Sequence, residues 1–138
     1  MPIVLEMQPS LDRIDPLVLS LKKEFENLLS EEKLGSMEIA LAEALANAVT
    51  HGTSAGQSEP IRVTASDSAA GVTVEIVDAG KQVPRELYEN VAALEDVDPL
   101  AENGRGLPLI RFLTDDLVFE HRDGQNRLQL LFARDPSA

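Results

Sequence analysis

Two pairs of alternating segments in the second half of the chain constrain its fold more than any other feature. IRVTASD (residues 61–67) and VTVEIVD (residues 72–78) are rich in β-branched residues and are separated by the short sequence SAAG. LVFEH (residues 117–121) and RLQLLFA (residues 127–133) flank the turn sequence RDGQN in the same way. Alternation with a period of two indicates strands, and the short connections indicate antiparallel hairpins. The pattern predicts a mainly antiparallel sheet.

The remaining periodic segments predict one further strand and three helices. IVLEM (residues 3–7) alternates like a strand, whereas residues 16–29 carry apolar side chains at helical spacing after an Asp-Pro start. The sequence EEKLG is interpreted as a turn, after which Ser36 caps a second helix that runs to about Thr50. A third helix is expected over residues 107–114. This order predicts an α+β fold, a two-layer α/β sandwich with helices on one face of the sheet.

Composition narrows the functional classes. The 138 residues suit a single domain spanning residues 1–138, and no apolar run is long enough for a membrane span. The N-terminus has no secretory signal pattern, so a cytoplasmic protein is expected. A net charge of −12 argues against direct binding to nucleic acid and is compatible with a basic protein partner. The chain has no cysteine and two histidines, which excludes thiolate and multi-histidine metal sites.

The sequence EALANAVTH contains the first candidate functional cluster. Glu43, Asn47 and His51 are spaced at i, i+4 and i+8, so they form one stripe of the expected second helix. Such a stripe is commonly a solvated face. Asn is a poor helix former, however, and its place among alanines suggests that a carboxamide is needed there.

Two later clusters lie at the ends of predicted elements, one where a strand ends and one where a helix begins. In VEIVDAG, Asp78 ends a strand and could accept hydrogen bonds from the amino group of a heterocycle, while Gly80 permits close backbone approach. In ENGRGLPLIRFL, Gly104 and Gly106 precede a helix whose first N–H groups lack intrahelical partners and could bind phosphate. Taken singly, Asp-Ala-Gly after a strand is most often a plain turn, and glycines before a helix commonly serve only the turn.

Together, and in this order, the clusters resemble the GHKL ATPases, whose nucleotide-binding fold is named after Bergerat. The similarity is greatest to the RsbW-like anti-sigma-factor serine-protein kinases: EALANAVTHG resembles their N box, VDAG their first glycine box, and DPLAENGRGLPLIRFLTDDL the end of their lid and their second glycine box. The resemblance implies ATP and Mg²⁺ as cofactors, with Glu43 as general base and Asn47 as metal ligand. It implies that Asp78 recognises adenine and that Gly80 lies close to the base. The residues that it implies for phosphate binding are Gly104, Arg105, Gly106 and Leu107.

The leading functional hypothesis from this resemblance is a serine-protein kinase and anti-sigma factor. Its partners would be a sigma factor and a STAS-domain anti-anti-sigma factor, without nucleic acid or membrane. Homodimers are common in the similar family, but the sequence does not fix the oligomeric state. The alternative is a nucleotide-binding regulatory module without kinase turnover, because Gln82 and Glu102 stand where many kinase members carry a glycine and a basic residue. A small ATPase without a protein substrate is a third reading. His51 is interpreted as a helix C-terminal residue that interacts with the helix dipole, and His121 as structural.

Overall fold

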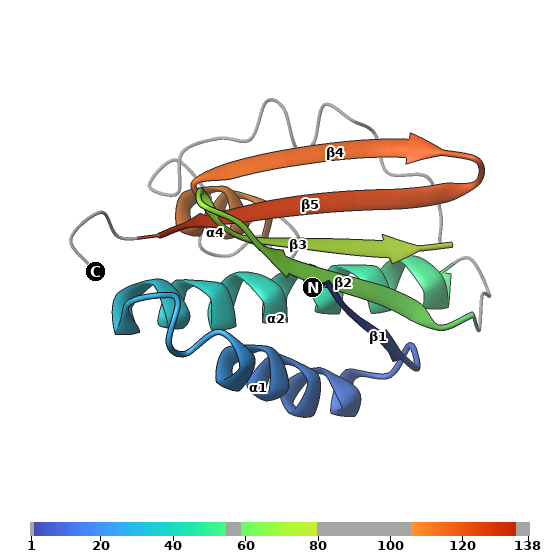
Figure 1. Ribbon diagram of the computed structural model, residues 1–138. Coiled ribbons are helices and arrows are strands. Elements are labelled where there is room, and N and C mark those ends of the chain that lie inside the picture. The colour runs from blue at the N-terminus through green and yellow to red at the C-terminus, as the bar shows by residue number, and fades with distance from the viewer. Residues whose placement is uncertain (1, 55–58, 80–105, 135–138) are drawn as a thin grey trace.

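The computed structural model describes residues 2–54, 59–79 and 106–134, which form a five-stranded sheet with helices packed on one face (Figure 1). The strand order is β1-β2-β3-β5-β4, and every neighbouring pair is antiparallel. The predicted α+β sandwich is therefore confirmed. In chain order the elements are β1 (Ile3–Met7), the short 3-10 helix η1 (Leu11–Arg13), α1 (Ile14–Glu24), α2 (Glu31–Ser54), β2 (Ile61–Asp67), β3 (Gly71–Asp78), α4 (Gly106–Leu113), β4 (Asp116–Arg122) and β5 (Gln125–Ala133).

Both predicted hairpins are present, and the turn between β4 and β5 has the geometry that its sequence favours. Asp123 and Gly124 have φ angles of 54° and 77°. Positive φ at both central residues is the requirement of a type I′ turn, whose twist matches that of the two strands, and Asp-Gly is among its preferred pairs. The turn fixes the β4–β5 register, in which His121 pairs with Asn126.

The hydrophobic core lies between the sheet and the helices. In β3 and β5 the core-facing positions alternate along each strand, with Val72, Val74 and Ile76 opposite Phe132, Leu130 and Leu128. The helices supply the other half of the core, and α2 contributes the longest buried stripe. Its buried residues are Leu34, Met37, Ala40, Leu41, Ala44, Leu45, Ala48 and Val49.

The predicted boundaries of the two N-terminal helices are wrong by up to five residues. The first helix, expected over residues 16–29, is α1 from Ile14 to Glu24, because the chain leaves helical geometry at Phe25 with φ −109° and ψ 14°. The turn predicted at EEKLG is instead the first turn of α2, which begins at Glu31. Ser30, not Ser36, is the cap: its hydroxyl accepts a hydrogen bond of 3.1 Å from the backbone N–H of Lys33.

The physical reason for the earlier start of α2 is tertiary packing. A glycine inside a helix costs up to about 1 kcal/mol of stability relative to alanine. Gly35 is therefore the residue that makes EEKLG resemble a turn. Leu34 and Met37 on either side of it are buried in the core, and burying such side chains stabilises the helix by more than the glycine costs. At the other end, α2 continues past Thr50 to Ser54, so the predicted end at His51-Gly52 is also wrong.

Candidate functional site

Helix α2 holds Glu43 and Asn47 on the border between its buried and exposed faces. Both side chains are half-buried, whereas Ile39 and Thr50 on the same helix are exposed. The prediction that the apolar residues of this segment face the core is confirmed, since Leu45 is fully buried. A carboxylate and a carboxamide one turn apart thus lie at the edge of the core without being enclosed in it. Helix α2 extends three residues beyond His51, whose side chain lies outside the described part.

Asp78 occupies the last position of β3 and is 6% exposed. Alternation puts it on the same face as Ile76 and Val74, toward the helices. The amide nitrogen of Asn126 donates a hydrogen bond of 3.1 Å to its carboxylate Oδ1. Helix α2 packs against β3, and in Figure 1 the C-terminal half of α2 runs toward the end of the sheet where β3 finishes. The predicted adenine-recognising carboxylate is therefore buried, held by a donor, and close to the helix that carries Glu43 and Asn47.

Asn126 and His121 are joined to Asp78 by hydrogen bonds, and the sequence reasoning did not connect either of them with the predicted site. Asn126 is 2% exposed and is the register partner of Asp78 on one side and of His121 on the other. Its side-chain Oδ1 lies 2.9 Å from Nδ1 of His121. A sequence signal for Asn126 does exist. It stands on the apolar phase of β5, two residues before Leu128, where a polar side chain needs a partner.

Helix α4 begins at the second glycine of the Gly-Arg-Gly sequence. Gly106 and Leu107 occupy its first two positions, so their backbone N–H groups belong to the first helical turn. Ile110 is fully buried, and α4 packs against α2. The helix start agrees with the predicted phosphate-binding position. Gly80, Gly104 and Arg105, together with Gln82 and Glu102, lie outside the described residues.

The arrangement fits a nucleotide in the parts that the structure describes. Asp78 offers a carboxylate held in place at the end of a strand, and Gly106 and Leu107 offer N–H groups at the positive end of a helix. Asn47 offers an amide oxygen, a hard ligand of the kind that Mg²⁺ prefers beside water and phosphate oxygens. Within the described ranges, no three His, Asp or Glu side chains gather closely enough to hold a metal ion by themselves.

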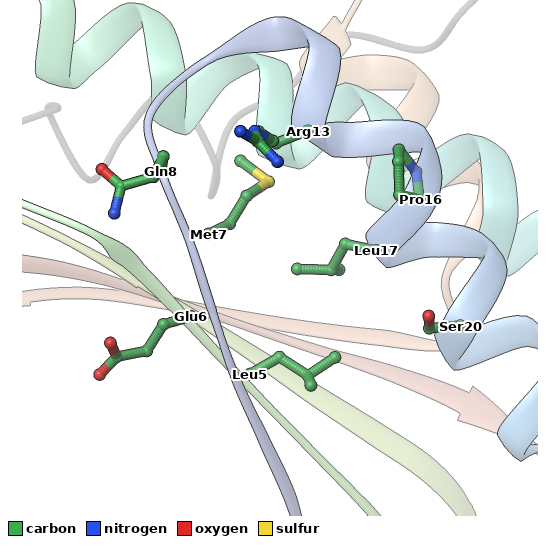
Figure 2. A pocket seen from close by; sticks show the side chains of 8 residues that line it. All are labelled: Leu5, Glu6, Met7, Gln8, Arg13, Pro16, Leu17 and Ser20. Carbon is green, nitrogen blue, oxygen red and sulfur yellow. The ribbon is translucent and has the colours of Figure 1, made fainter.

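A separate hollow lies between β1 and α1, at the edge of the sheet (Figure 2). It has a volume of about 380 Å³, and Leu5, Met7 and Leu17 point into the space between strand and helix. None of the residues that line it belongs to the predicted nucleotide site.

In the part of the chain that the structure describes, no helix is long and apolar enough to cross a membrane.

Comparison with known proteins agrees with this geometry. Solved structures of other proteins share the fold at low sequence identity. The crystal structure of the RsbU and RsbW domains of Rv1364c from Mycobacterium tuberculosis aligns over 97% of this chain with a TM-score of 0.70 and 16% identity. This chain spans only 32% of that protein's chain. A chain of the SiaB–SiaC complex from Pseudomonas aeruginosa aligns over 94% of this chain and 88% of its own, with a TM-score of 0.66 and 13% identity.

The catalytic domain of the histidine kinase ThkA aligns over 98% of both chains, with a TM-score of 0.60 and 16% identity. No curated protein matches the sequence. The model of the histidine kinase-like ATPase domain, by contrast, matches residues 7–132, nearly the whole chain. The predicted resemblance to the histidine kinase-like ATPases is thereby confirmed, and the chain belongs to the histidine kinase-like ATPase domain family.

Proposed function

We propose that this domain is an ATP- and Mg²⁺-dependent serine-protein kinase of the anti-sigma-factor type. The observation that carries the proposal is the pairing of Glu43 and Asn47, half-buried and one turn apart, on the helix that packs against the strand ending in Asp78. Family membership and the shared fold support an ATPase-type nucleotide site. The residue pair supports group transfer, because a site that only holds a nucleotide needs no carboxylate to accept a proton.

Each residue has a distinct role in the proposed reaction. Asp78 accepts a hydrogen bond from the adenine amino group, and Asn47 Oδ1 is a ligand of Mg²⁺, which neutralises phosphate charge. Glu43 accepts the proton of the substrate serine hydroxyl. The serine oxygen bonds to the terminal phosphorus of ATP while the bond from that phosphorus to the bridging oxygen of ADP breaks. The backbone N–H groups at Gly106 and Leu107 bind phosphate oxygens. Gly80, Gly104 and Arg105 keep the roles that the resemblance implies, close approach to the base for Gly80 and phosphate binding for Gly104 and Arg105.

The proposed substrate is a serine of a STAS-domain anti-anti-sigma factor, and the competing partner is a sigma factor. The domain acts in a partner-switching circuit in the cytoplasm, as a homodimer and without binding nucleic acid. Support comes from solved structures of the same fold: one contains an RsbW domain beside an RsbU domain, and another is a SiaB–SiaC complex. The net charge of −12 also favours a basic protein surface over nucleic acid.

Phosphate transfer from radiolabelled Mg-ATP to a STAS-domain protein tests the kinase. We expect Glu43→Gln to lower the transfer rate about 10²- to 10⁴-fold, the usual contribution of a general base, while ATP affinity is retained. Asn47→Ala should weaken binding of Mg-ATP more than binding of metal-free ATP. Glu38→Gln is the matched control, because Glu38 is a half-buried glutamate on the same helix. Its carboxylate forms an ion pair with Lys22 at 3.2 Å. Unchanged transfer by Glu43→Gln would refute the assignment of the base.

The second candidate is a regulatory module that sequesters a protein partner without turnover. The hollow beside β1 favours it, because β1 is an edge strand and exposed apolar residues such as Val4 and Leu11 accompany it. Such a module would bind its partner equally with and without nucleotide. Calorimetry of partner binding with ATP, with ADP and without nucleotide separates the two functions, since the kinase cycle requires different affinities in these states.

A further inference from the structure

Three polar side chains form a continuous row across three strands at one end of the sheet. Asp78 on β3 is the register partner of Asn126 on β5, which is in turn the register partner of His121 on β4. Hydrogen bonds of 3.1 Å and 2.9 Å join them in that order. Asp78 and Asn126 are buried, and His121 is half-buried. A polar row at this depth is a single connected unit, because each member limits the orientation of the next.

Donor and acceptor chemistry fixes the direction of the row. The oxygens of an ionised carboxylate only accept, so the side chain of Asn126 must present its NH₂ group to Asp78. Its Oδ1 then faces His121 and can only accept. His121 must therefore donate from Nδ1, which in the neutral ring selects the Nδ1–H tautomer. If the amide of Asn126 were reversed, its oxygen would face the carboxylate oxygen of Asp78.

The position of Asn126 argues that this row does more than satisfy buried groups. Leu128, Leu130 and Phe132 occupy the core-facing positions that follow it on β5, and an apolar residue at 126 would continue this packing without any partner. A buried amide costs desolvation that only its hydrogen bonds recover. The amide instead holds the carboxylate to which the proposed function assigns adenine recognition.

We propose that His121 is a positioning residue for base recognition, acting through Asn126 on Asp78. Through the hydrogen bond that Asn126 donates to Oδ1, the His121–Asn126–Asp78 row sets the direction of the whole carboxylate, so that Asp78 selects a base bearing an amino group. This inference rests on the proposed nucleotide site. It adds Asn126 on β5 and His121 on β4 as the side chains that determine the selectivity of the site for adenine.

The tautomer of His121 can be measured without any nucleotide. Long-range ¹H–¹⁵N spectra of the imidazoles, recorded where the rings are neutral, distinguish Nδ1–H from Nε2–H. The chain has two histidines, so the signals of His121 are assigned by their loss in His121→Asn. We expect the Nδ1–H form for His121. The Nε2–H form would overturn the proposed row whether or not the protein binds ATP.

Base selectivity tests the functional half of the proposal. In ITP a carbonyl oxygen replaces the adenine amino group and N1 carries a hydrogen, so the ratio of ATP to ITP affinity reports whether Asp78 recognises the edge of the base that bears the amino group. Asn126→Leu should reduce this ratio about tenfold, the usual effect of losing one hydrogen bond to a charged group. Gln129→Leu is its matched control, because Gln129 is an exposed amide on the opposite face of β5. Circular dichroism establishes that each variant is folded.

A pair of variants at His121 keeps the test independent of the buried Asn126. In His121→Asn the amide nitrogen is two bonds from Cβ, as Nδ1 is in histidine. This variant should therefore keep the hydrogen-bond donor and preserve the ATP-to-ITP affinity ratio within about twofold. His121→Leu has no donor and should reduce the ratio about fivefold. An unchanged ratio in His121→Leu and Asn126→Leu, with ATP binding intact, would overturn the positioning role alone. Failure of the unsubstituted protein to bind ATP would instead refute the proposed function.

Discussion

Three glycines should respond to the same substitution in three different ways, and the most informative is Gly71 at the start of β3. An added Cβ there would lie 2.2 Å from the carbonyl oxygen of Phe132 and 2.8 Å from Cα of Ala133. The first distance is about 1 Å shorter than an ordinary carbon–oxygen contact of roughly 3.3 Å. Both neighbours are backbone atoms of β5, which cannot rotate away as a flexible side chain could. Gly71→Ala must therefore push the central strand β3 away from its neighbour β5.

The expected cost combines this clash with backbone strain. Gly71 has a φ of +147°, and a residue with a Cβ held in such a region costs about 1–3 kcal/mol. Displacing the end of the β3–β5 ladder adds the loss of at least one buried backbone hydrogen bond, about 1–3 kcal/mol. The sum, about 2–6 kcal/mol, is a large part of the roughly 5–15 kcal/mol that typically stabilises a domain.

Gly35→Ala and Gly124→Ala are the matched comparisons. At either glycine, nothing lies within 4 Å of the position that the added methyl group would take. Gly35 is in the first turns of α2, so alanine should stabilise the fold by about 0.5–1 kcal/mol. Gly124 has a φ of +77° in the β4–β5 turn, and alanine there should cost about 1–2 kcal/mol from strain alone.

Urea unfolding followed by circular dichroism measures all three free energies of unfolding on one scale. The expected order of stability is Gly35→Ala above the unsubstituted protein, then Gly124→Ala, then Gly71→Ala. A loss below about 1 kcal/mol in Gly71→Ala would refute the register that pairs Gly71 with Ala133. Destabilisation by Gly35→Ala would show that EEKLG forms a turn, as its sequence suggests, and not the start of α2.

Two further predictions concern the start of α2 and its tie to β5. Ser30→Ala should lower the free energy of unfolding by about 1 kcal/mol, because it removes the cap on the N–H of Lys33, and thermal unfolding beside the Ser36→Ala control measures it. Burial opposes ionisation of Asp115, but hydrogen bonds from Lys33 and from the N–H of Ala133 outweigh it and lower its pKa below the usual 3.8. The stabilisation from Asp115 is therefore present above the unfolded pKa and is lost as the pH falls through the lowered folded pKa. The difference in stability between the unsubstituted protein and Asp115→Asn should be constant near neutral pH and shrink on acidification, and a pH-independent difference would contradict this linkage.

Local pattern was sufficient to identify most elements of this fold. Alternation in residues 61–67 and 117–133 predicted strands that are present, because side chains in a strand alternate between a buried and an exposed face whatever the partner. The boundaries predicted for α1 and α2 were wrong, because a helix end depends on which side chains the rest of the molecule buries. Leu34 and Met37 are the decisive case: their burial extends α2 through Gly35.

The candidate site divides in the same way. Helical and strand periodicity alone were enough to predict that Glu43 and Asn47 share one helix face and that Asp78 ends a strand. The contact of Asn126 with Asp78, 48 residues earlier in the chain, and the partner of His121 became visible only in the folded molecule. Strand order and register bring these side chains together, and neither is encoded in the local pattern of a single strand.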